Sequence, residues 1–293
     1  MPDSLTLMAV HAHPDDEVLY TGGVLAKYSN EGVRTVVVTC TLGQAGSDAA
    51  GRCHSRESLG EMRQSELRSA ARVLGVSRLY TLGYLDSGKI SGSSDNHAAC
   101  FSRTDTQLAV GRLVNLIRQE RPDVLMSYDE NGDYGHPDHV KAHEITVAAF
   151  GAAALPTAYP NHEPPWRVSK LYYVYSRPSM QLKAVETRAR RSGSNGRAPA
   201  WEAGVVDFVH YQDNLPARTV VDVGQYLDLK LKALKCHQSQ LAGYERILRL
   251  PRNMLVEFAG SEWFVLARSR LESVPADSVE RDLFAGLRQK RAS

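Results

Sequence analysis

The sequence predicts an α/β fold in which a mostly parallel sheet carries helices on both faces and is followed by a smaller α+β lobe. Apolar, β-rich runs alternate with amphipathic stretches through the first half of the chain, an order typical of parallel strands joined by crossover helices. After about residue 155 the pattern changes to segments rich in proline and tyrosine. We therefore expect a Rossmann-like core at residues 1–170 and a smaller C-terminal lobe at residues 171–293.

Each element of the core follows from a local pattern. A buried strand is expected at 5–10 and a second at 35–41, which has three consecutive valines at its centre. The helix expected at 55–74 has apolar residues at helical spacing and is followed by Gly75, in the usual position of a C-terminal glycine. The remaining core elements are predicted as strands at 79–82 and 124–128 and helices at 22–30, 107–119 and 137–152.

The C-terminal lobe offers fewer signals. We expect a strand at 170–175, a polar loop at 187–200, a helix at 223–239 and a closing strand at 263–267. In this interpretation the lobe forms one wall of the crevice beyond the carboxyl ends of the core strands.

The composition is that of an ordinary globular protein. The 293 residues are 43% hydrophobic and 23% charged, and a formal net charge of +2 gives no reason to expect a nucleic-acid or membrane partner. The four cysteines lack CxxC spacing, so neither a disulfide framework nor a thiolate zinc site is indicated. Neither a secretion signal nor an apolar run that could span a bilayer is visible. We expect a soluble, cytoplasmic protein.

Two segments concentrate histidines and carboxylates. Residues 11–17 read His-Ala-His-Pro-Asp-Asp-Glu, residues 134–139 read Tyr-Gly-His-Pro-Asp-His, and each follows a predicted strand. Because ligands of open parallel sheets bind beyond the carboxyl ends of the strands, both segments are expected at the crevice. The glycines after the second strand do not form the three-glycine dinucleotide fingerprint, so no nicotinamide cofactor is predicted.

The candidate metal ligands are His13, Asp16 and His139. The first two are three residues apart across a turn that enters a helix, and the third can reach the same point from the other segment. Two imidazoles and one carboxylate, with the other positions open to water, suit Zn(II) and also Fe(II). His143, one helical turn after His139, is an alternative fourth ligand, although a closed site would block substrate. Strand alternation is expected to turn His11 away.

Four further residues are catalytic candidates. Asp15, next to Asp16, is placed to accept a proton from a water molecule at the metal. His136, with Asp138 close to it, could become an imidazolium that stabilises an oxyanion or protonates a leaving amine. Tyr134 is a further oxyanion donor. Together with the metal ligands, these residues indicate a metal hydrolase.

Both motifs resemble those of a known family. Residues 9–17 and 128–139 are similar to the N-acetylglucosaminylphosphatidylinositol deacetylase, or LmbE-like, superfamily of metal-dependent amidases. Within it, the chain most resembles the mycothiol branch, which contains the inositol-glucosamine deacetylase and the mycothiol S-conjugate amidase. Segments 82–88, 166–173 and 180–181 favour the S-conjugate amidase.

The resemblance implies a role for each candidate residue. It makes the three candidate ligands above a zinc site, Asp15 the general base, and His136 and Tyr134 the groups around the oxyanion. It also implies that Arg63 and Asp86 grip the sugar and inositol part of the substrate.

Tyr20 departs from the family pattern. At this substrate-side position the resemblance leads us to expect serine in the deacetylase and lysine in the amidase. Residue 20 therefore does not identify the acyl group that the enzyme accepts. It is also compatible with a specialised relative of the family from antibiotic biosynthesis.

The implied activity is zinc-dependent hydrolysis of the amide between a glucosamine and its acyl group, most like that of the S-conjugate amidase. The partner would be a small glucosaminyl-inositol or mycothiol-conjugate substrate. The alternative is an N-acetylglucosaminyl-inositol deacetylase or another GlcNAc N-deacetylase. Outside this class, a non-haem Fe(II) enzyme would use the same ligand types, normally in an all-β barrel. An inactive sugar-binding protein would keep Arg63 and Asp86 but lose the base, whereas Asp15 is present.

Overall fold

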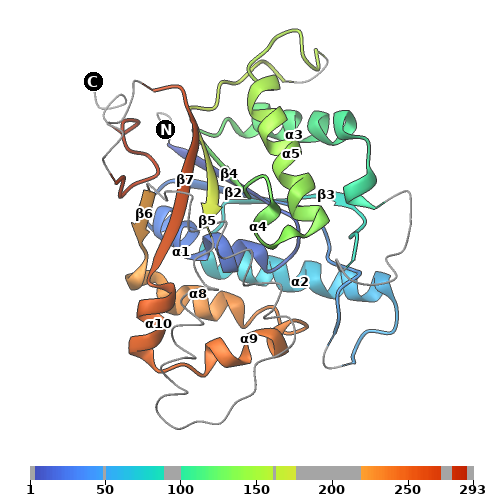
Figure 1. Ribbon diagram of the computed structural model, residues 1–293, viewed down its shortest axis with the longest axis vertical. Coiled ribbons are helices and arrows are strands. Elements are labelled where there is room, and N and C mark those ends of the chain that lie inside the picture. Colours follow the sequence, from blue (N-terminus) through green and yellow to red (C-terminus); the bar gives the residue numbers. More distant parts are fainter. Residues whose placement is uncertain are drawn as a thin grey trace.

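Strands and helices alternate along the chain in the computed structural model, which describes residues 4–48, 51–88, 100–160, 163–175, 219–271 and 279–288 (Figure 1). The strands are β1 (Thr6–His11), β2 (Arg34–Thr41), β3 (Arg78–Tyr84), β4 (Val124–Ser127), β5 (Lys170–Tyr175), β6 (Thr219–Asp222) and β7 (Ser261–Ser269). The helices are α1 (Asp16–Asn30), α2 (Arg56–Leu74), α3 (Thr106–Glu120), α4 (Gly132–Gly135), α5 (Pro137–Ala152), α8 (Leu227–Leu234), α9 (Leu241–Leu248) and α10 (Arg252–Ala259). Short 3-10 helices lie at Phe101–Arg103 and Gly224–Tyr226.

The strands form a mostly parallel sheet, which confirms the predicted fold class. Their order is β3-β2-β1-β4-β5-β7-β6, and β7 runs in the opposite direction to the other six described strands. The chain moves outward from β1 through β2 to β3 and then restarts on the other side of β1 with β4. A topological switch point therefore lies between β1 and β4, where open α/β sheets bind their ligands.

Helices cover both faces of the sheet (Figure 1). Helices α1 and α2 pack together with α8 on one face, and α3 and α5 pack together on the other. All six residues of β1 are buried, as are nearly all of those in β2. Central parallel strands that are covered on both sides read as continuous apolar runs, which is why these two were predictable from sequence.

Helix α1 begins earlier than the sequence predicts. It starts at Asp16, directly after the first motif, and not at residue 22. The prediction was wrong because Gly22 and Gly23 look like a helix boundary, yet both lie inside the helix. A Cβ added at Gly23 would lie 2.5 Å from a methyl group of Val223, so the glycine permits close packing against the segment after β6. The early start places Asp16 in the first helical turn.

The C-terminal part differs from the prediction in its helices. The helix predicted at 223–239 is shorter: a 3-10 turn precedes α8, which ends at Leu234, and turns follow up to residue 240. These turns bring His237 into the interior, where it pairs with Glu17. Strand β6 and helices α9 and α10 were not predicted.

The sheet continues past residue 170. Strand β5 pairs in parallel with β4 and antiparallel with β7, so the strands predicted for the C-terminal lobe extend the sheet of the core. The domain boundary at 170/171 stays a prediction. The loop predicted at 187–200 lies outside the described residues. Among the described helices, none combines the length and apolar character required to cross a membrane.

Candidate active site

The two motifs meet at the switch point between β1 and β4. His13 and Asp16 follow β1, and His139 lies in the first turn of α5, after β4. The Nδ1 atom of His13 lies 3.4 Å from Oδ2 of Asp16 and 3.3 Å from Nε2 of His139. The distance from Nε2 of His139 to Oδ2 of Asp16 is 3.5 Å. Three atoms from distant parts of the sequence thus form a nearly equilateral triangle.

This triangle has the size of one face of a metal coordination tetrahedron. With metal–ligand bonds of about 2.0–2.2 Å, two ligand atoms of a tetrahedral zinc site are about 3.3–3.6 Å apart. All three residues are buried, and His13 and Asp16 also line a cleft of about 540 Å³. The set therefore fits a divalent cation that is held on one side and reached from the cleft on the other.

Other groupings of ligand atoms share His13. The ligand atoms of His13, His136 and His139 lie within 4.8 Å of one another, and so do those of His13, Asp86 and Asp138. The shorter contacts of Asp16 to both histidines favour Asp16 as the third ligand. The assignment of these three residues as metal ligands stays a prediction.

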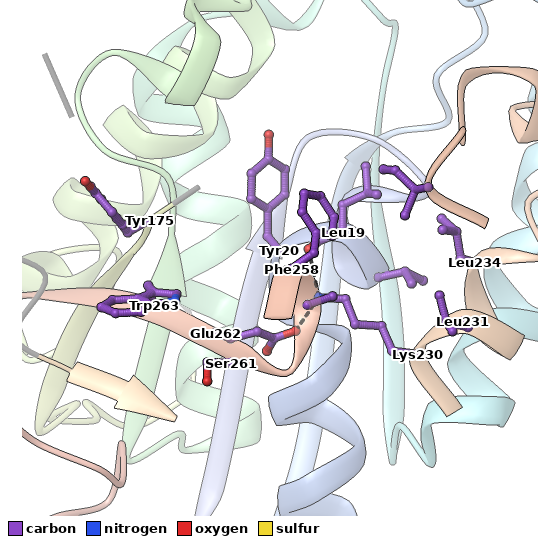
Figure 2. Close-up of a pocket in the computed structure, with 13 residues that line it drawn as sticks. Leu19, Tyr20, Tyr175, Lys230, Leu231, Leu234, Phe258, Ser261, Glu262 and Trp263 are labelled. Atoms are coloured by element: carbon purple, nitrogen blue, oxygen red, sulfur yellow. Dashed lines mark hydrogen bonds and ion pairs between the residues drawn. The ribbon is translucent and has the colours of Figure 1, made fainter. Parts of the chain in front are cut away.

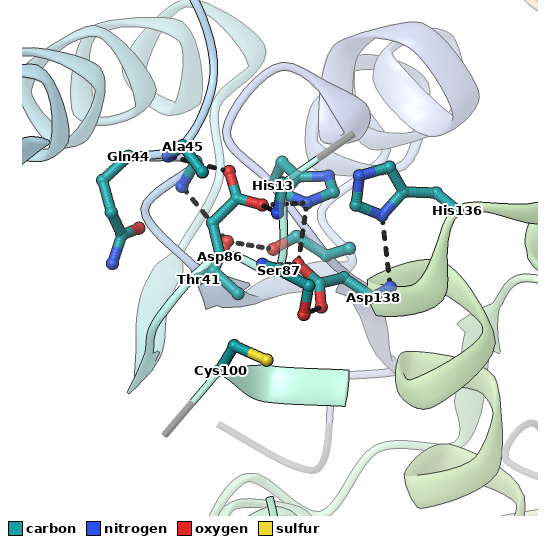
Figure 3. Close-up of polar contacts among 12 residues, drawn as sticks. His13, Thr41, Gln44, Ala45, Asp86, Ser87, Cys100, His136 and Asp138 are labelled. Atoms are coloured by element: carbon teal, nitrogen blue, oxygen red, sulfur yellow. Dashed lines mark hydrogen bonds and ion pairs between the residues drawn. The ribbon is translucent and has the colours of Figure 1, made fainter. Parts of the chain in front are cut away.

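The second ring nitrogen of His13 faces carboxylates (Figure 3). Its Nε2 atom lies 3.2 Å from Oδ2 of Asp138 and 3.6 Å from Oδ1 of Asp86. Asp138 accepts hydrogen bonds from the backbone N–H of Ser87, at 2.9 Å, and from the Ser87 hydroxyl. A carboxylate on the far nitrogen fixes the tautomer and orientation of a metal-binding histidine. Burial opposes a charge on His13, but Asp138 and the neighbouring carboxylates raise its pKa well above the usual value.

Asp138 was a catalytic candidate, and its placement favours a supporting role instead. Its side chain is fully buried and contacts Nε2 of His13, the ring nitrogen that is not part of the triangle. It is also absent from the lining of the cleft.

Tyr128 orients the other two candidate ligands. Its hydroxyl donates to Oδ2 of Asp16, at 2.7 Å, and accepts from the backbone N–H of Ala12, at 2.9 Å. Its ring stacks on His139 with centroids 4.1 Å apart. Nδ1 of His139 is buried without a hydrogen-bond partner in the described part of the chain, so this stacking contributes to the ring's orientation. Burial would raise the pKa of Asp16, but His139 and His13 outweigh it and lower that pKa, which favours the ionised form.

Asp15 occupies a rare backbone conformation immediately before α1. Its φ of 107° is uncommon for any residue with a side chain. The Asp15 N–H donates to Oε2 of Glu17, at 2.9 Å, and Oε1 of Glu17 lies 2.7 Å from Nε2 of the buried His237. These contacts from α1 and from the turn after α8 stabilise a conformation that would otherwise be unfavourable.

The Asp15 carboxylate is held by two side chains and lines the cleft. Its Oδ2 atom accepts a hydrogen bond from the Tyr244 hydroxyl, at 2.9 Å, and lies 3.3 Å from Nη2 of Arg63. Burial, partly offset by Arg63, raises the pKa of Asp15 to about 6. A carboxyl group with such a pKa can exchange a proton near neutral pH, as the predicted general base must.

His136 and Tyr134 also line this cleft. Nδ1 of His136 accepts the N–H of Asp138, at 3.2 Å, and so caps α5. The proton of the neutral ring is then on Nε2. Burial and the neighbouring His13 lower the pKa of His136, which favours this neutral donor over the imidazolium expected from sequence. Tyr134 is 48% exposed, and burial of its hydroxyl raises its pKa, so it too is a neutral donor.

The three predicted substrate contacts all line the cleft, but each already has protein partners. Arg63 is buried and donates to the carbonyl oxygens of Pro14 and Gly43, at 2.5 and 2.8 Å. Asp86 accepts the backbone N–H groups of Ala45 and Gly88, at 3.1 and 2.8 Å, and the Tyr20 hydroxyl donates to Asp133. Their direct contact with substrate stays a prediction.

The remaining histidines of the motifs lie outside the triangle. Nε2 of His11 contacts the Thr21 hydroxyl at 3.0 Å, in the core position expected from strand alternation. Nδ1 of His143 lies 2.9 Å from the carbonyl oxygen of Tyr128, and its ring faces Tyr173. This placement does not favour His143 as a fourth ligand.

Sequence reasoning missed the residues that support the site, which are Glu17, Ser87, Tyr128, His237 and Tyr244. Glu17 and Tyr128 lie within the recognised segments, residues 9–17 and 128–139, and their position there was the available signal. Ser87 lies in segment 82–88, which carries part of the resemblance, whereas His237 and Tyr244 come from distant segments without a local pattern.

Comparisons with known proteins show which family the chain is similar to. A family model described as GlcNAc-PI de-N-acetylase (PIG-L) matches residues 8–150, which contain both motifs. A protein of Rhodococcus erythropolis named 1D-myo-inositol 2-acetamido-2-deoxy-alpha-D-glucopyranoside deacetylase is 38% identical, over 96% of this chain and 97% of its own. A Streptomyces coelicolor protein named mycothiol S-conjugate amidase is 36% identical, over 98% and 99% of the two chains.

A solved structure shares the fold. The N,N'-diacetylchitobiose deacetylase from Pyrococcus horikoshii superimposes with a TM-score of 0.62 at 22% identity, covering 90% of this chain and 84% of its own. The relatives are named as deacetylases and amidases, which are hydrolases. With this identity over nearly its full length, the chain belongs to the PIG-L (LmbE-like) family of hydrolytic enzymes.

Proposed function

We propose that this protein is a zinc-dependent amide hydrolase that removes the acyl group from an N-acylated glucosamine, most like a mycothiol S-conjugate amidase. The observation that carries the proposal is the triangle of His13, Asp16 and His139 with Asp15 beside it in the same cleft. The named relatives act at this type of bond. The cytoplasmic location expected from sequence belongs to the same proposal.

The candidate ligands fit zinc through their atom types and spacing. Bound there, zinc would polarise the amide carbonyl and lower the pKa of water. Iron(II) accepts the same ligands, so the metal is part of the proposal.

The side chains around the metal site then transfer protons and stabilise the developing oxyanion. Asp15 removes a proton from the attacking water, since its pKa of about 6 leaves it mostly ionised at neutral pH. Tyr134 and Nε2–H of His136 donate hydrogen bonds to the oxyanion that develops on the amide oxygen. The protonated Asp15 then delivers its proton to the departing amine, which regenerates the carboxylate.

We propose that the sugar of the substrate binds in the part of the cleft that is lined by polar groups. Asp86, Arg63 and Gln240 line this part, together with backbone at Ala45 and Gly46. Polar side chains and backbone groups are suited to the hydroxyls of a glucosaminyl-inositol.

A side-by-side assay tests the proposal. Zinc-loaded protein is given N-acetylglucosaminyl-inositol and a bimane conjugate of mycothiol, and release of free amine is measured for each. Faster hydrolysis of the conjugate supports the amidase, and faster hydrolysis of the acetyl compound supports the deacetylase. Failure to release amine from either substrate by a protein that has bound zinc would refute the proposed function.

A further inference from the structure

A second cavity, which we call the Trp263 pocket, shares lining residues with the catalytic cleft. Figure 2 shows the residues that line this pocket. Its volume is about 180 Å³. Leu19 and Tyr20 line both the pocket and the cleft, so the two spaces adjoin at these residues. The remaining walls come from the end of β5, the start of β7, and helices α8, α9 and α10.

The sheet order places this pocket on the side of the metal site opposite the proposed sugar contacts. Tyr175 ends β5 and pairs with Trp263 near the start of the antiparallel β7, so both lie at the sheet edge where the catalytic motifs lie. Asp86 and Gly46 follow β3 and β2, which are on the other side of β1. An amide at the metal site can therefore extend its sugar toward one flank and its acyl group toward Tyr20.

The charged groups of the pocket are paired with protein partners. Nζ of Lys230 lies 2.7 Å from Oε1 of Glu262 and 3.1 Å from the carbonyl oxygen of Leu19. The Glu262 carboxylate also accepts the N–H groups of Gly23 and Val24, at 2.7 and 2.8 Å. A paired carboxylate and ammonium offer little to an additional charged ligand.

Apolar side chains supply most of the remaining lining. They include Leu19, Leu231, Leu234, Ile247, Phe258 and Trp263. A concave, mainly apolar surface beside a reaction centre is suited to the hydrocarbon part of a substrate.

We propose that the Trp263 pocket binds the apolar end of the substrate's acyl group, and that the enzyme accordingly prefers acyl groups longer than acetyl. This inference rests on the proposed function, because that function places the scissile amide beside Tyr20. An acetyl group adds one methyl carbon beyond the carbonyl and cannot fill the pocket. A longer apolar chain is removed from water there, which increases binding with each methylene.

Hydrolysis of two matched substrates tests the preference. We expect kcat/KM for N-octanoylglucosaminyl-inositol, the eight-carbon straight-chain acyl compound, to exceed that for the N-acetyl compound at least tenfold. Leu231→Asp puts a charge into the pocket and should reduce this ratio toward one. Leu229→Asp is the matched control on the same helix, because Leu229 is 39% exposed and does not line the pocket. Equal kcat/KM for the two substrates, or an equal effect of both variants, would overturn the inference.

A binding measurement keeps the inference separate from the proposed function. The fluorescence of Trp263 is titrated with the free eight-carbon fatty acid, and Trp263→Phe identifies the signal of that residue. Saturable binding that Leu231→Asp weakens and Leu229→Asp retains supports the pocket, even if neither amide is hydrolysed. Absence of saturable binding, as when another segment of this chain fills the pocket, would contradict it.

Discussion

The hydroxyl of Tyr244 donates a 2.9 Å hydrogen bond to the carboxylate of Asp15, although 229 positions separate the two residues. The bond joins helix α9, near the end of the described chain, to the first motif. A segment without catalytic residues of its own thus sets the position of the proposed base. Removing this hydroxyl should change the chemistry at Asp15 while leaving the metal ligands in place.

Tyr244→Phe is therefore expected to lower kcat about tenfold, the usual consequence of losing one hydrogen bond to a charged group. Zinc content should equal that of the parent protein, because Tyr244 contacts none of the three candidate ligands. Steady-state kinetics and metal analysis measure the two quantities. Tyr80→Phe is the control, since its hydroxyl bonds to Glu120, away from the cleft. An unchanged kcat in Tyr244→Phe would remove the proposed positioning role.

Asp15→Ala should retain zinc and lose most activity. We expect kcat to fall by about 10²–10⁴-fold, the contribution typical of a general base. His13→Ala, in contrast, should lose the metal. Amine release and metal content are compared in both variants. Parent-like activity of Asp15→Ala would exclude Asp15 as the base.

Asp138→Asn is expected to weaken zinc binding by about 10–100-fold, because Asp138 orients His13 from its far nitrogen. Competition with a chelator measures the affinity. Asp228→Asn is a suitable control, since Asp228 is an exposed partner of Arg252. If activity fell in Asp138→Asn while zinc affinity stayed constant, Asp138 would act in catalysis, as the sequence first indicated.

The contact between Glu17 and His237 predicts a pH-dependent contribution to stability. Burial opposes protonation of His237, but Glu17 outweighs it and raises the pKa of His237 above 6.5. Protonated His237 is thus favoured in the folded state. Its contribution is fully present below about pH 6.5 and is lost as the pH rises through the folded-state pKa.

Glu17→Gln should therefore lower the melting temperature more at about pH 6 than at about pH 9. Thermal unfolding with saturating zinc, followed by circular dichroism, measures the difference between the variant and the parent at each pH. A difference that grows as the pH rises would contradict this role for the pair.

The sequence was sufficient to predict the fold class and to name three candidate ligands that the fold brings together, for a physical reason. Buried parallel strands are continuous apolar runs, and the two motifs come after two of them: His13 lies just after β1, and His139 lies at the start of α5, after β4. Because β1 and β4 are neighbours at the switch point, residues that are distant in sequence become close in space.

The supporting residues could not be predicted in this way. Ser87, His237 and Tyr244 each contact one residue of the site, and these contacts form only because the folded chain brings distant segments together. A serine, histidine or tyrosine in a loop or short helix is compatible with many roles. The start of α1 was also missed, since Gly23 signals a boundary in sequence but serves close packing in the structure.

The most direct test of the account is the zinc content of four variants measured by mass spectrometry after equilibrium dialysis. His13→Ala, Asp16→Ala and His139→Ala should each lose zinc, whereas the parent should bind a single ion per chain. His143→Ala is the matched control, because His143 lies one turn after His139 on α5 and contacts Tyr128 and not the triangle. Zinc retained at the parental level by the first three variants, or lost equally from His143→Ala, would contradict the proposed metal site.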